Sequence, residues 1–129
     1  MADTATLSVG VVIKNASAET VLSSLLADFS DAAVDDRYAF KCLATNGAAI
    51  TPLDLSASGF AGPVTGMIVK NLDGANEVDV TWTDNDANSN TQLIPAEGFL
   101  VIPDLDPATD PTFEGDGGDV LCEVIIFGA

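Results

Sequence analysis

One strand–turn–strand stretch constrains the fold of this chain more than any other part of it. Residues 64–70 are apolar and rich in β-branched side chains, and Val78, Val80 and Trp82 alternate with polar residues. Such alternation places one set of side chains on a buried face and the other in water. Between the two patterns, residues 71–76 carry Asn, Asp and Gly, which tolerate the backbone angles of turns. We therefore expect a hairpin that forms the core scaffold of a β-rich molecule.

Strand patterns also occur on both sides of this hairpin. Residues 5–13 and 37–45 alternate in the same way. Asn46-Gly47 follows the second of these, and because Asn-Gly suits a type I′ turn it predicts a hairpin with a return strand over residues 48–55. Shorter apolar runs predict further strands at residues 92–94, 99–102 and 120–127. About seven or eight short strands favour a mostly β fold, either an antiparallel β-sandwich or a jelly-roll-like barrel.

One segment has helical rather than strand spacing. Its apolar residues recur three and four positions apart, at Val21, Leu22, Leu25, Leu26 and Phe29. A stripe with this spacing covers one face of an amphipathic α-helix. We expect one short α-helix over residues 18–28 that packs on the sheet, in preference to a helix that binds a partner. The chain of 129 residues is expected to form a single β domain, residues 1–129.

The inward faces of the predicted strands define the expected core. It contains Val69, Val78, Val80, Trp82, Leu100, Ile102, Val124 and Ile126. Trp82 is the only tryptophan, and an exposed tryptophan on a β-sandwich would indicate sugar stacking. Its register with Val78 and Val80 favours a place in the core instead.

The charge of the chain excludes several classes of partner. There are 20 acidic residues against four basic ones, Lys14, Arg37, Lys41 and Lys70, and the formal net charge is −16. Such a surface repels phosphate, so we expect neither nucleic-acid binding nor binding to an anionic membrane. No signal peptide and no apolar run long enough to span a bilayer are visible, and synthesis in a cytoplasm is expected. Cys42 and Cys122 are interpreted as small buried hydrophobic residues in preference to a disulfide.

The residues needed for catalysis are not found in recognisable patterns. The chain has no histidine, which excludes a Ser-His-Asp triad, a Cys-His pair and a histidine-ligated metal. Gly115-Asp-Gly-Gly118 lacks the lysine and the helix pattern of a phosphate-binding loop. We therefore expect that the protein is not an enzyme and that it needs no cofactor.

Calcium is the one metal for which the sequence offers candidates. Asp84, Asp86 and Asn88 have the spacing that begins an EF-hand loop, but Ser89 stands where glycine is needed and Pro95 where the bidentate glutamate should be. A second acidic loop contains Asp104, Asp106 and Asp110, followed by Glu114, Asp116 and Asp119. Because calcium needs closely specified coordination, both loops are interpreted as solvated acidic loops, and no metal site is predicted.

Several segments, taken in order, resemble a known family. They are Leu53-Asp-Leu-Ser-Ala-Ser-Gly59, Met67-Ile-Val-Lys-Asn-Leu-Asp73, Val78-Asp-Val-Thr-Trp82, Leu93-Ile-Pro-Ala-Glu-Gly-Phe-Leu-Val-Ile-Pro103 and Gly117-Gly-Asp-Val-Leu-Cys-Glu-Val-Ile-Ile-Phe-Gly128. Their order resembles that in small structural proteins of tailed bacteriophage virions. The resemblance covers roughly residues 50–129 and comes closest to the capsid decoration, or cement, proteins.

The resemblance implies a binding role on the outer capsid surface of the virion. A decoration protein binds the outer face of the head and stabilises contacts between major capsid proteins, commonly as a homotrimer or homodimer. The major capsid protein and a second copy of this chain are then the expected partners. Leu7, Val9, Val11 and Ile13 of the N-terminal strand are the candidate interface. The alternative is a carbohydrate- or receptor-binding module of a head fibre or tail tip, which needs an exposed aromatic platform, Trp82 with Tyr38, or a bound calcium ion.

Overall fold

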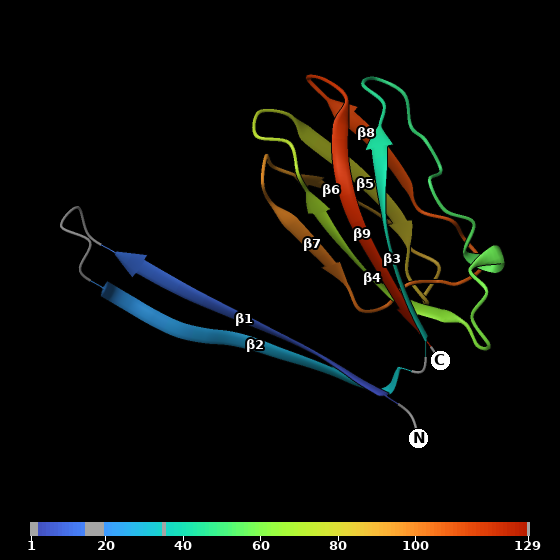
Figure 1. The fold of residues 1–129 in the computed structure, drawn as a ribbon, viewed down its shortest axis with the longest axis horizontal. Coiled ribbons are helices and arrows are strands. Elements are labelled where there is room, and N and C mark those ends of the chain that lie inside the picture. Colours follow the sequence, from blue (N-terminus) through green and yellow to red (C-terminus); the bar gives the residue numbers. More distant parts are fainter. Residues whose placement is uncertain (1–2, 15–19, 35, 129) are drawn as a thin grey trace. The chain divides into compact units, whose positions relative to one another are not determined.

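The computed structural model describes residues 3–14, 20–34 and 36–128, and its backbone groups into two compact units, Met1–Asp35 and Asp36–Ala129 (Figure 1). The single domain expected from the length of the chain stays a prediction. Both units consist of β-strands, and the described part of the chain has no helix long and apolar enough to cross a membrane.

The first unit is a two-stranded antiparallel hairpin. Strand β1 (Asp3–Lys14) pairs with strand β2 (Thr20–Val34). The prediction of an α-helix over residues 18–28 is therefore wrong for residues 20–28, and residues 18 and 19 lie outside the described ones. The pairing explains the misleading spacing. Val9 pairs with Ala27 and Gly10 with Leu25, so Leu26 is an extra residue in β2, and such a bulge interrupts the two-residue period.

The second unit is a sandwich of two antiparallel sheets. The first sheet has the strand order β3 (Asp36–Ala44), β9 (Val120–Gly128), β4 (Val64–Asn71) and β7 (Phe99–Ile102). The second has the order β6 (Ser89–Ile94), β5 (Glu77–Thr83) and β8 (Thr112–Asp116). A short 3₁₀ helix, η1 (Leu55–Ala57), lies between β3 and β4 in the chain. The mostly β, antiparallel fold is confirmed, while the strand order does not establish a jelly roll.

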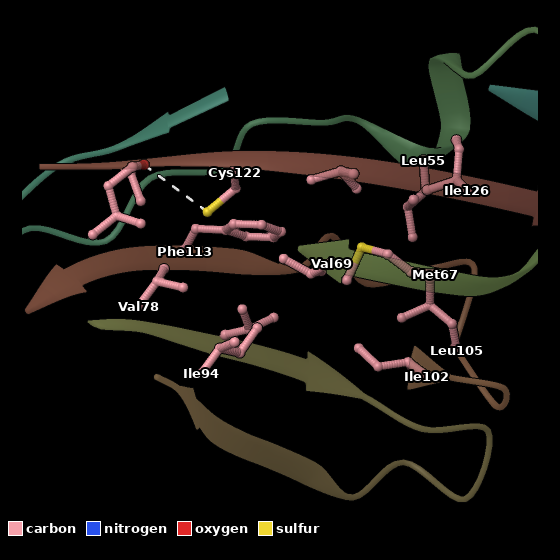
Figure 2. Packing of buried hydrophobic residues seen from close by; sticks show 14 of the residues in the cluster. Leu55, Met67, Val69, Val78, Ile94, Ile102, Leu105, Phe113, Cys122 and Ile126 are labelled. Carbon is pink, nitrogen blue, oxygen red and sulfur yellow. Dashed lines mark hydrogen bonds between the residues drawn. The ribbon is translucent and has the colours of Figure 1, made fainter. Parts of the chain in front are cut away.

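The core lies between these two sheets. Figure 2 shows Met67, Val69 and Ile126 of the first sheet and Val78 and Phe113 of the second pointing into the space between them. Among the residues expected in the core, Val69, Val78, Val80, Ile102, Val124 and Ile126 are buried. Trp82 and Leu100 are partly buried and pack against the same cluster. Burial alternates along β9, as expected for a strand with one covered face.

Residues 64–82 form the two expected strands, β4 and β5, but not the expected hairpin. Strand β4 pairs with β9 and β7, whereas β5 pairs with β6 and β8. The turn between β4 and β5 therefore crosses from one sheet to the other. Asn71 holds this crossing, because its buried side chain donates hydrogen bonds to the carbonyl oxygens of Asn76, Ile94 and Pro95.

The hairpin predicted at Asn46-Gly47 does not form either. Strand β3 ends at Ala44, and the backbone then forms single bridges with β8 at Asn46 and Ile50. The amide of Gly47 donates to the carbonyl of Gly115 at 3.1 Å, so this segment pairs with the second sheet and does not fold back on β3. Gly47 lies where the backbone leaves the first sheet for the second, and it adopts a positive φ of 70°, which costs glycine little.

Candidate interaction surface

The surface of the first sheet that faces away from the core is the candidate functional site. Side chains in a strand alternate between the two faces of its sheet, and the inward positions of these four strands are the ones that the core buries. The outward positions are therefore fixed by the register of the strands. We call this surface the outer face of the first sheet.

Three rows of side chains cross this face. The first row is apolar and consists of Ala39, Ile125, Ile68 and Val101. The second row consists of Lys41, Glu123, Lys70 and Phe99. At the end of the sheet, Leu43 pairs with Leu121, whose carbonyl accepts a hydrogen bond from the amide of Leu72. The apolar first row and the Leu43–Leu121 pair therefore lie on either side of the second row, which carries a charged residue in three of its four strands.

This face exposes an unusual amount of apolar side chain. Phe99 is 56% exposed, Leu43 is 54% exposed and Leu121 is 41% exposed. Large apolar side chains that gather on one face of a small protein mark an interaction surface more often than isolated ones do. Leu43 and Leu121 are adjacent in neighbouring strands, and Phe99 lies on the same face at the opposite edge of the described sheet.

The same face also carries two of the basic residues of the second unit, Lys41 and Lys70. Lys41 and Lys70 both lie opposite Glu123 in the register. The ammonium group of Lys70 also donates a hydrogen bond to the backbone carbonyl of Glu97. Arg37, the remaining basic residue of this unit, is paired in register with Phe127. In a chain of charge −16, this concentration makes the outer face of the first sheet electrostatically distinct.

The outer face of the second sheet has the opposite character. Two pairs of carboxylates lie directly opposite each other in its register: Glu77 with Asp116, and Asp79 with Glu114. Like charges in this arrangement destabilise a sheet. The hydroxyl groups of Thr81 and Thr91 lie next to this acidic surface and form a hydrogen bond of 2.8 Å. The sandwich therefore has one apolar and basic face and one acidic, hydroxyl-rich face.

The candidate calcium ligands accept hydrogen bonds from other residues of the loops in which they lie. The Oδ1 atom of Asp84 accepts hydrogen bonds from the backbone amides of Asp86 (3.0 Å) and Asn88 (2.9 Å). These bonds, the one from Asn88 foremost, keep the pKa of Asp84 below its ordinary value. Asn88 and Asn90 also donate to the Asp84 carboxylate through their side chains. Asp84 thus acts as the organising residue of its turn.

The second acidic loop uses its carboxylates in the same way. Asp106 accepts from the amide of Ala108 and the hydroxyl of Thr109, and Asp110 accepts from the amide of Leu55 at 2.8 Å. The structure brings the two loops together, because the side chain of Asn85 donates to the Asp104 carboxylate. Among the described residues, no group of three or more acidic or cysteine side chains is placed to hold a metal ion.

The other predicted site residues are placed as follows. The candidate interface residues Leu7, Val9, Val11 and Ile13 all lie in β1, in register with β2. The aromatic platform required by the alternative function is divided, because Tyr38 lies in the first sheet and Trp82 in the second. Trp82 packs against the core, and Tyr38 stacks on Phe40 with ring centroids 5.7 Å apart.

Sequence reasoning missed the outer face of the first sheet. Alternation in residues 37–45 already placed Lys41 and Leu43 on one side of a strand. The signal that was lacking is the order of the strands, which brings Leu121 and Phe99 into the same surface. Comparison with known proteins adds no relative: no protein-family model matches the chain, and no curated protein and no solved structure was found that matches it.

Proposed function

We propose that this chain is a bacteriophage capsid decoration protein that binds the outer face of the head and stabilises contacts between major capsid proteins. The ordered segments that resemble virion structural proteins support this proposal, and they lie within the sandwich unit. The role is one of binding only, so it needs no catalytic group and no cofactor.

The observation that carries the proposal is the difference in charge between the two outer faces of the sandwich. The outer face of the first sheet offers apolar area with Lys41 and Lys70 within it, which fits an apolar capsid surface that carries carboxylates. The acidic outer face of the second sheet would then point to water. A decorated particle would gain negative surface charge, which favours colloidal solubility.

We also propose that the N-terminal hairpin joins copies of this chain into a homotrimer or homodimer. A two-stranded sheet in water is marginally stable by itself, and β1 carries the apolar residues Leu7, Val9, Val11 and Ile13. A second copy supplies the apolar partner in a closed, symmetric assembly. Sedimentation equilibrium of the variant Val9→Asp should show a smaller species than the wild type. An unchanged mass would remove the hairpin from the interface.

Co-sedimentation tests the proposed function. The full chain is mixed with heads purified from the phage that encodes it and stripped of accessory proteins, and the bound copies per head are counted at saturation. A decoration protein should reach a plateau at a copy number set by the symmetry of the capsid, because it occupies equivalent lattice positions. Binding that does not saturate, or that requires exposed DNA, would contradict the proposal.

A further inference from the structure

The two cysteines of the chain lie directly opposite each other in neighbouring strands. Cys42 of the edge strand β3 pairs in register with Cys122 of β9. Directly opposite residues in an antiparallel ladder have Cα atoms about 4.5 to 5.5 Å apart. A disulfide spans about 4.4 to 6.8 Å between Cα atoms, so this register fits it without movement of the backbone.

Both side chains occupy the core side of the sheet. Cys122 is buried, between the buried residues Val120 and Val124 on the same face of β9. Cys42 lies at the same register level in the outermost strand of the described sheet and is only partly buried. The pair therefore combines one partly buried cysteine with one buried cysteine.

The two thiols differ in acidity and in burial. The Cys122 thiol donates a hydrogen bond to the carbonyl oxygen of Val120 (3.9 Å). The neighbouring Cys122 thiol lowers the pKa of Cys42, against the opposing effect of burial, while Cys42 and burial raise the pKa of Cys122. Cys42, the less buried of the two, is therefore assigned as the attacking thiol and Cys122 as the resolving one.

We propose that Cys42 and Cys122 form a cross-strand thiol pair that closes to a disulfide by exchange with a low-molecular-weight disulfide such as oxidised glutathione. The Cys42 thiolate attacks one sulfur of the reagent, forms a mixed disulfide and releases one glutathione thiolate, which takes up the proton that Cys42 lost. The Cys122 sulfur then attacks the Cys42 sulfur, and the second glutathione leaves with the Cys122 proton. The protein loses two electrons and two protons, and one oxidised glutathione becomes two glutathione thiols.

Closure of this pair ties an edge strand to the interior of the sheet. Among the strands that the structure describes, β3 is paired only with β9, and it carries Lys41 and Leu43 of the outer face. The disulfide would prevent β3 from separating from β9 without changing the residues that this face presents. The inference rests on the register and the burial of the two cysteines and does not depend on the proposed function.

Intact-mass spectrometry of the full chain treated with oxidised glutathione tests the proposal. The folded wild type should lose two hydrogens and retain no adduct, and non-reducing proteolysis should recover one cross-linked peptide that contains Cys42 and Cys122. The variant Cys122→Ala should instead accumulate one glutathione adduct on Cys42. Cys42→Ser should keep its mass, because its remaining thiol is buried.

The wild type unfolded in urea is the internal control, since the two thiols are then far apart and should acquire adducts. A stable adduct on the folded wild type, a disulfide between two chains, or two unreacted thiols would each overturn the proposal. The wild-type result stands without the variants, so a variant that fails to fold leaves the test intact.

Discussion

Replacement of Asn71 by alanine should be among the most destabilising polar substitutions in the sandwich. The Nδ2 group donates to the carbonyls of Asn76 (2.9 Å), Pro95 (3.1 Å) and Ile94 (3.3 Å), and Oδ1 accepts from the amide of Asp73 (2.8 Å). A carboxamide has only two N–H groups, so the three donated bonds share them. The side chain thus supplies about three full hydrogen bonds, each with a net contribution of about 1 kcal/mol.

The expected loss is therefore about 3 kcal/mol of the free energy of unfolding, because the buried Asn71 side chain makes these hydrogen bonds and alanine makes none of them. Such a loss is a large part of the roughly 5 to 15 kcal/mol that stabilises a typical domain. In urea, with a slope of about 2 kcal/mol/M, the midpoint should fall by about 1.5 M.

Urea titration followed by the fluorescence of Trp82 measures this directly, because the only tryptophan lies in the sandwich unit. The matched control is Asn85→Ala, which removes an exposed carboxamide whose hydrogen bond goes to the exposed carboxylate of Asp104. It should change the free energy of unfolding by no more than about 0.5 kcal/mol. If Asn71→Ala costs no more than this control, Asn71 does not hold the crossing between the sheets.

Three further predictions concern charge. Hydrogen bonds, chiefly those from the amides of Asn76 and Ala75, lower the pKa of Asp73 below its ordinary value of 3.8. The ionised carboxylate therefore contributes its full stabilisation at pH values above 3.8. This contribution is lost as the pH falls through the lowered pKa of the folded state. Asp73→Asn should therefore flatten the acid limb of a plot of melting temperature against pH, and an unchanged limb would contradict this role. Glu114→Lys turns the repulsive pair with Asp79 into an attractive one and should stabilise the sheet by about 0.5 to 1 kcal/mol. Asp86→Lys, which makes the same charge change in an exposed loop, should gain less stability than Glu114→Lys. Added NaCl should raise the melting temperature of the wild type, because salt screens the repulsion between its acidic residues. Equal gains for the two lysine variants would assign the effect to net charge alone.

The sequence located most of the strands of the sandwich, because period-two alternation is a local property. The patterns at residues 64–70, 99–102 and 120–127 match Val64–Asn71, Phe99–Ile102 and Val120–Gly128 closely. Strand β8 was overlooked within a long acidic loop, because its five residues include Gly115 and two acidic side chains. A short strand of this composition has little β propensity and is held by its neighbours.

Pairing and function could not be predicted in the same way. Residues 64–82 contain a turn between two strands whether the strands pair or cross between sheets, and the crossing is seen only in the pairing of β4 with β9 and β7 and of β5 with β6 and β8. In the first unit, register shifts at Val21 and Leu26 interrupt the two-residue period by which a strand is recognised. The outer face of the first sheet depends on which strands are neighbours, which is a property of the whole fold.

The most direct test of the proposed docking face compares the affinities of two matched variants for purified heads. Phe99 and Leu93 are both exposed apolar residues of edge strands, but they lie on the outer faces of the first and the second sheet, respectively. In a co-sedimentation isotherm of the full chain, Phe99→Asp should weaken binding by at least about tenfold, or roughly 1.4 kcal/mol, while Leu93→Asp should bind like the wild type. Equal affinities for the two variants, or a loss confined to Leu93→Asp, would contradict the assignment of the outer face of the first sheet as the capsid-binding surface.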